Sequence, residues 1–160
     1  MADFTFNQGL GRPCEYASRV ANNDPANSAL VIVLLKVVEA DNVLEDYDTL
    51  AAILAAPGNT EADFTNYARI VFDDTDISEP VPNDTNNTQS VDMPDPVWVS
   101  AGGITDNNLV KLLVCFDSDT TGGTDANLVP LTAHDFVITT NGNDLTGAVN
   151  AAGFFTASKT

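Results

Sequence analysis

Ser-Ala-Leu-Val-Ile-Val-Leu-Leu-Lys-Val-Val, from Ser28 to Val38, is the stretch that decides the fold. Aliphatic and β-branched residues fill it almost without interruption, which is typical of a central strand buried on both faces. A buried helix has a similar pattern, but the valine and isoleucine content favours the strand. Leu109 to Asp117 has the same character, and Ala68 to Phe72 predicts a shorter strand.

Further strand segments lie in the second half of the chain. Ser90 to Ser100 alternates apolar and polar residues, and its prolines favour an edge strand or two short strands with a bend. Asn141-Gly142 is the strongest hairpin-turn signal, since both residues accept a positive φ. The other segments with strand character are Leu128 to Leu131, His134 to Thr140 and Ala148 to Thr156.

Helical spacing is confined to one region. Leu50, Ile53 and Leu54 predict a helix from Leu44 to Ala56, which Pro57-Gly58 ends. Thr60 to Tyr67 predicts a second, shorter helical turn. Together with the strands, this predicts a mainly β fold: an antiparallel β-sandwich or barrel, jelly-roll-like, with one or two short helices inserted around residues 44–67.

The first residues have a different composition from the body of the chain. Phe4 and Phe6 alternate with polar residues ahead of a stretch rich in glycine. We expect residues 1–13 to form an N-terminal arm and residues 14–160 a single β-rich domain. The two rings dock either on their own domain or on a neighbouring molecule. Because aromatic residues dominate buried interfaces, Phe4, Phe6 and Arg12 are the candidate partner contacts.

Composition and charge exclude several function classes. The 160 residues include 23 acidic and 6 basic ones, which gives a net charge of −17. Such a surface repels phosphate backbones and anionic membranes, so we expect neither nucleic-acid nor membrane binding. The first residues lack the basic and apolar regions of a signal peptide, so we expect synthesis in the cytoplasm. Cys14 and Cys115 are then expected to stay reduced, as small buried or half-buried side chains.

No motif in the chain predicts catalysis or a cofactor. His134 is the only histidine, and its place in a predicted strand favours a hydrogen-bonded sheet residue over a catalytic base. The loop Asp117 to Asp125 has oxygen ligands at the spacing of a calcium loop, but Leu128 stands where a bidentate glutamate is needed. We therefore expect no enzymatic activity, no metal and no cofactor.

The order of segments resembles a group of small tailed-bacteriophage virion structural proteins, which includes head decoration (cement) proteins. The resemblance spans residues 12–157 and implies a structural role, with no active-site residue to carry over. The blocks that carry it are Arg19 to Pro25 with Ala29 to Lys36, Asp46 to Leu50, Phe64 to Arg69, Lys111 to Thr124, Pro130 to Phe136 and Gly153 to Phe155.

This resemblance implies a place in the virion. We expect a decoration protein on the outer surface of the capsid, because packaged DNA inside the shell would repel so acidic a protein. The alternative is a neck, tail or adhesin-like component that binds another virion protein or a host-surface glycan. The expected partner is the major capsid protein or another virion protein, and the expected assembly is a homo-oligomer, a trimer or a dimer.

Overall fold

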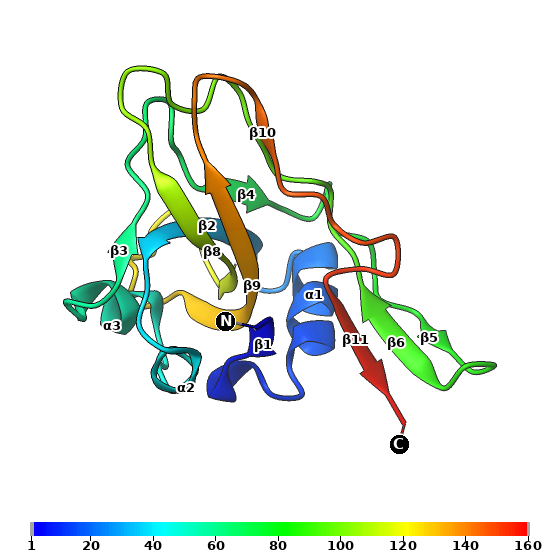
Figure 1. Ribbon diagram of the computed structural model, residues 1–160. Coiled ribbons are helices and arrows are strands. Elements are labelled where there is room, and N and C mark those ends of the chain that lie inside the picture. Colours follow the sequence, from blue (N-terminus) through cyan, green and yellow to red (C-terminus); the bar gives the residue numbers. More distant parts are fainter. Residues whose placement is uncertain (1, 160) are drawn as a thin grey trace.

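A six-stranded antiparallel sheet forms the centre of the protein (Figure 1). The computed structural model describes residues 2–159. The strand order is β1-β9-β8-β2-β3, and β4 also pairs with β2. The bounds are β1 Phe4–Thr5, β2 Ala29–Val37, β3 Thr60–Glu61, β4 Ile70–Phe72, β8 Asn108–Asp117 and β9 Val129–Thr139.

Two smaller antiparallel sheets complete the β structure. In one, β7 (Val97–Trp98) pairs with β10 (Leu145–Thr146). The other contains β5 (Pro82–Asn83), β6 (Thr88–Val91) and β11 (Phe155–Ser158), with β6 in the middle. This three-stranded sheet, which we call the wing, projects to the lower right in Figure 1.

Both faces of the main sheet are covered. From β2, Leu30, Ile32 and Leu34 enter a core that includes residues of helix α1 (Pro13–Ala21) and of β7. Their neighbours Val31, Val33 and Leu35 point to the opposite face, into a core with residues of helix α3 (Leu50–Ala55). The predicted two-sided burial of this strand is confirmed, as is the mainly β, antiparallel, sandwich-like fold with a few short helices.

The helices differ most from the sequence prediction. Helix α1 was not predicted, although Pro13 at its first turn and the buried Ala17 and Val20 have the spacing of one helix face. The single helix predicted from Leu44 to Ala56 is wrong: α2 (Asp41–Leu44) ends before α3 begins. Thr49 is extended and its hydroxyl accepts the amide of Ala52, so it caps α3 and prevents one continuous helix.

Two further local predictions need correction. Thr60 begins strand β3 instead of the predicted helical turn, because it pairs with Val37 of β2. Asn141-Gly142 turns the chain with Gly142 at φ +88°, but it does not join a hairpin. The Gly142 amide donates to the carbonyl of Ala101, and the following strand β10 pairs with β7 instead of β9. The two segments predicted on either side of Thr132 form one strand, β9.

The expected N-terminal arm is an integral part of the fold. Phe4 and Thr5 form β1, which extends the sheet beside β9. Phe6 is fully buried in the core below β2, with residues of α3. Of the two options for these rings, Phe6 docks on its own domain, where the core removes its ring from water. The expectation that Phe6 contacts a partner is therefore corrected.

A buried lysine ties this N-terminal segment to the sheet. Lys111 of β8 is 0% exposed, and its Nζ donates to the Ala2 carbonyl at 2.6 Å and to Asp135 at 2.6 Å. Asp41 lies 3.3 Å from the same ammonium and accepts the Ala2 amide. Burial opposes ionisation of Asp41, but the Ala2 amide and Lys111 outweigh it and lower the pKa of this carboxyl.

The helices of this protein are short. Within residues 2–159, every helix is too short or too polar to cross a lipid bilayer.

We predict that Lys111→Ala destabilises the protein by about 3 kcal/mol, because it leaves Asp41 and Asp135 without their buried counter-ion. Chemical denaturation at neutral pH measures the loss. Lys159→Ala, which removes an exposed lysine from the C-terminal end, is the matched control and is expected to change stability little. Equal stability of the two variants would contradict the anchoring role of Lys111.

Phe6→Ala tests whether the N-terminal segment is part of the core. We expect a loss of about 3–5 kcal/mol in the free energy of unfolding, as for other large-to-small changes of fully buried aromatic residues. Leu10→Ala is the control, since Leu10 is 62% exposed. A Phe6→Ala protein as stable as the control would show that the segment is dispensable for folding.

Candidate functional site

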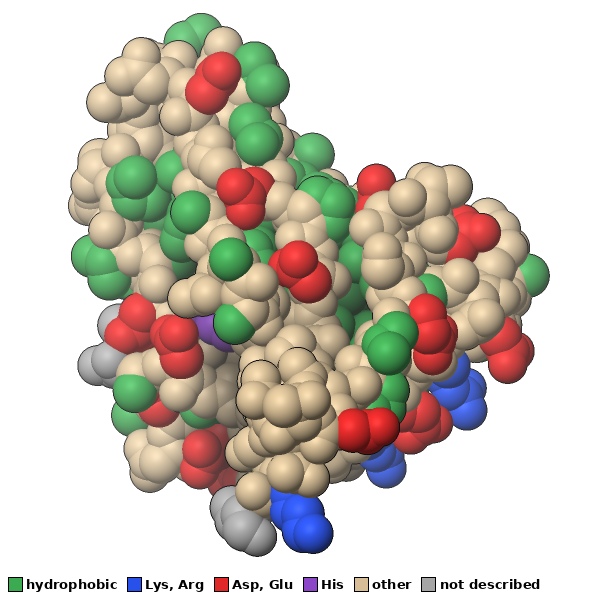
Figure 2. Space-filling view, turned by 90° about the vertical axis from the view of Figure 1, so that its right-hand side faces the viewer, with side chains coloured by type: hydrophobic (Ala, Val, Ile, Leu, Met, Phe, Trp, Pro, Cys, Tyr) green, Lys and Arg blue, Asp and Glu red, His purple; other side chains and the backbone are tan. Residues whose placement is uncertain are grey.

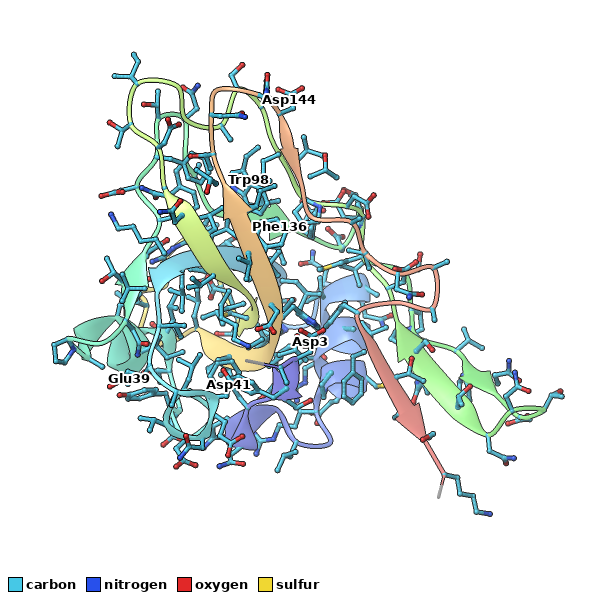
Figure 3. The ribbon with its side chains drawn as sticks, in the orientation of Figure 1. Asp3, Glu39, Asp41, Trp98, Phe136 and Asp144 are labelled. Atoms are coloured by element: carbon cyan, nitrogen blue, oxygen red, sulfur yellow. The ribbon has the colours of Figure 1, made fainter. Side chains whose placement is uncertain are left out.

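The main sheet and the wing meet at a cavity of about 430 Å³. One wall is the N-terminal segment with β9, and the other is the chain that connects β10 to β11. In Figure 2 the single histidine, in purple, is only partly visible, because neighbouring segments cover it. Figure 3 labels Asp3 and Phe136, which lie along the side of β9 that faces the segment leading into β11.

Strand geometry places the side chains of the first wall. Thr132, His134 and Phe136 alternate along β9, so they point to the same side of the sheet and all three line the cavity. Phe136 packs against Trp98, with ring centroids 6.4 Å apart. The Trp98 indole in turn donates to the Ala68 carbonyl at 2.8 Å, which fixes the ring behind Phe136.

A glycine shapes the second wall. Gly153 has φ +89°, and a Cβ at this position would collide with the carbonyl oxygen of Val91. Only glycine permits this close approach, which directs Phe154 and Phe155 toward the cavity. The Phe154 ring meets the His134 imidazole edge-on, with centroids 6.4 Å apart. The two walls are therefore in direct contact across this pair.

His134 is held by hydrogen bonds at both ring nitrogens. Its Nδ1 lies 3.3 Å from Asp3 Oδ2 and its Nε2 lies 2.9 Å from Thr132 Oγ1. Because a carboxylate only accepts, Nδ1 carries the proton, and a neutral ring then accepts the Thr132 hydroxyl at Nε2. The other Asp3 oxygen accepts the Asp135 amide at 2.7 Å. The predicted hydrogen-bonded sheet histidine is confirmed.

The hydrogen-bonded residues Thr132, His134 and Asp3 follow the order of a catalytic triad, with a hydroxyl, an imidazole and a carboxylate. The Thr132 hydroxyl, however, is enclosed. Thr132 is only 2% exposed, so a substrate carbonyl cannot reach its Oγ1 at bonding distance. The hydrogen bonds instead fasten the N-terminal segment to β9 and hold the imidazole still. That the chain is not an enzyme stays a prediction.

The acidic loop considered for calcium is closed by protein contacts. Asp125 accepts two hydrogen bonds from Arg69, whose guanidinium also binds both oxygens of Glu61. Asp119 accepts the amide and hydroxyl of Thr121. Among residues 2–159, no three side chains of the metal-binding types His, Cys, Asp and Glu are grouped so that they could hold an ion.

The two cysteines are free. Cys115 is fully buried in the sheet, and this burial raises the pKa of its thiol to about 12. Cys14 is half-buried, and burial raises the pKa of its thiol too. The interpretation of both as small buried or half-buried side chains is confirmed.

The structure separates the three predicted contact residues. Phe4 lines the cavity, Phe6 is buried below the sheet, and Arg12 is exposed and donates to the Tyr16 hydroxyl at 3.2 Å. Sequence reasoning missed the other wall residues. Alternation along β9 would have placed His134 and Phe136 on one face, but nothing in the sequence brings the Gly153 segment to them.

A second exposed apolar region lies at the upper end of the molecule in Figure 1, which we call the tip (residues 97–107 and 136–146). Its two segments are joined by backbone hydrogen bonds: the Ala101 amide donates to the Asn143 carbonyl, and the Gly142 amide donates to the Ala101 carbonyl. Figure 2 shows hydrophobic side chains, in green, spread over this end. The exposed apolar residues of the tip are Val97, Val99, Ile104, Val137 and Ile138.

Comparison of the chain with protein-family models, with curated proteins and with solved structures finds no match.

We predict that the Arg69–Asp125 pair makes stability depend on pH. The hydrogen bonds from Arg69 lower the pKa of Asp125, so the unfolded state binds more protons in acid. The pair therefore stabilises the fold above the normal carboxyl pKa, and this contribution is lost as pH falls through the lowered value.

Asp125→Asn measures this contribution. The variant should lose about 1 kcal/mol at neutral pH, because the carboxylate is partly exposed, and this deficit should shrink as pH falls below the normal carboxyl pKa. Asp84→Asn, in the exposed turn of the wing, is the matched control. A deficit of Asp125→Asn that stays constant from neutral to acid pH would contradict the ion pair as its cause.

Proposed function

We propose that this protein is a virion structural protein of a tailed bacteriophage, which binds the outer surface of the capsid as a decoration (cement) protein and stabilises the head. It acts without catalysis or cofactor. The observation that carries the proposal is the combination of a net charge of −17 with apolar side chains left in water at the tip and at the cavity. Such a surface suits contact with protein and not with nucleic acid.

Charge supports the outer surface of the head over its interior. Packaged DNA presents a dense array of phosphates, and acidic subunits facing it would be repelled. The outer surface of a shell does not face this array of phosphates. An acidic protein there remains soluble before it binds and does not compete for the packaged genome.

The exposed apolar residues support binding to protein. Ile104 is 92% exposed, Val137 78% and Val99 65%, so three large hydrophobic side chains at the tip contact mainly water. Isolated exposed hydrophobic residues are ordinary, but a group at one end of a strongly charged protein is typical of an interaction surface. The partner we propose is the major capsid protein, and the bound form is a homo-oligomer, a dimer or a trimer.

Stoichiometric mass spectrometry of purified virions tests the proposal. We expect copies on the order of hundreds per particle, since a decoration protein follows the symmetry of the shell. The major capsid protein in the same sample is the internal standard. A copy number of about a dozen would instead indicate the neck or tail component. Absence from intact particles would overturn a virion role altogether.

A further inference from the structure

The cavity between the main sheet and the wing has the size and walls of a binding pocket. Its volume of about 430 Å³ lies within the range of small-ligand sites. Phe136, Phe154 and Phe155 are only partly buried, so three aromatic rings are available to an incoming group. At the base, the half-buried His134, held in place by its hydrogen bond to Thr132, presents a polar ring.

The charges around this cavity have one sign. The carboxylate side chains among its lining residues are Asp3 and Asp135, and neither lysine nor arginine lines it. Lys111 compensates Asp135 from inside the sheet. The side chain of Asp3 is 62% exposed, and within residues 2–159 its one cationic partner is His134, when that ring is protonated. A group with positive charge would therefore complement the rim.

Beside the cavity, the outer edge of β9 is open. β1 pairs with β9 only at Ala133 and Thr132, and the Asp3 side chain takes the Asp135 amide. From Phe136 to Thr139 the strand continues, and within residues 2–159 no strand pairs with its outer edge there. An open edge next to a pocket is the arrangement that binds extended peptide segments in other proteins.

We propose that this cavity binds an extended segment of the partner protein, which inserts an aromatic side chain between the phenylalanine rings and places a lysine or arginine against Asp3. The inference rests on the proposed function, because it names the site through which the capsid partner is held. The rings supply apolar contact, Asp3 supplies the charge preference, and the β9 edge aligns the backbone.

Blocked dipeptides test the recognition directly. The probes are acetyl-Phe-Lys-amide, acetyl-Phe-Glu-amide and acetyl-Ala-Lys-amide, titrated into the ¹⁵N-labelled protein. We expect saturable shifts of the His134, Gly147 and Phe154 amides with the first probe, and binding about tenfold weaker for each of the others. Equal binding of the lysine and glutamate probes, or no saturable shift with the first, would overturn the proposal.

Variants separate the cavity from the rest of the surface. Ala148→Trp, at an exposed lining position, fills the cavity and should abolish binding of acetyl-Phe-Lys-amide. Ala126→Trp adds the same side chain at an exposed position outside the cavity lining and should bind as the wild type does. If Ala148→Trp melts more than a few degrees lower, Thr156→Trp, which also lines the cavity, replaces it. Undiminished binding by the folded cavity variant would overturn the proposal.

The charge contribution has its own variant. Asp3→Asn keeps an oxygen to accept the Asp135 amide but removes the negative charge. We expect about tenfold weaker binding of acetyl-Phe-Lys-amide. Binding of acetyl-Phe-Glu-amide should stay the same or become slightly stronger, because its repulsion by Asp3 is removed. Asp84→Asn is the matched control. If Asp3→Asn binds the lysine probe as the wild type does, Asp3 is not the charge that selects the segment.

Occupancy of virions distinguishes failure of this inference from failure of the proposed function. A wild-type protein absent from particles would overturn the virion role. A wild-type protein present in particles, with Ala148→Trp and Ala126→Trp incorporated equally, would leave the virion role intact and overturn the cavity as its partner site. We expect incorporation of Ala148→Trp alone to fall.

Discussion

The pairing of β2 with β8, buried on both faces, is the constraint on which the rest of the structure depends. Seven residues of β2, Ala29 to Leu35, pair in register with Asp117 to Lys111 of β8. Because successive side chains alternate, the pair needs an apolar layer on each face. Helix α1 and the two small sheets supply one layer, and Phe6 with α2 and α3 supplies the other. The short helices therefore cover the apolar faces of the sheet.

Lys111 links the N-terminal segment to the main sheet. An ammonium inside a sheet is stable only with partners around it, and here the partners come from α2, β9 and the Ala2 carbonyl. The same segment carries Asp3, which fixes His134 and the Asp135 amide. One chain end thus satisfies a buried charge, adds a strand to the sheet and forms one wall of the cavity.

Sequence reasoning succeeded where one local pattern determines the structure and failed where distant segments compete. Two-sided hydrophobic runs identified β2 and β8, because their β-branched residues favour a buried strand over a buried helix. Thr49 divided a predicted helix, since its capping hydroxyl outweighed the helical spacing around it. Asn141-Gly142 turns as predicted, but the strand that follows it, β10, pairs with β7 and so does not form a hairpin with β9. The cavity could not be predicted, because Gly153 and His134 meet only through tertiary pairing.

We ascribe the function of this acidic protein to a pocket beside an open strand edge, where aromatic rings and the exposed carboxylate of Asp3 face an incoming group. Electrostatic repulsion disfavours nucleic acid at such a surface, and we propose a cationic, apolar protein segment as its partner. A cryo-electron microscopy reconstruction of purified virions tests this most directly. We expect the molecule on the outside of the shell, with the cavity between main sheet and wing filled by a segment of the shell protein. A molecule placed against the packaged DNA, or bound with that cavity open to solvent, would contradict it.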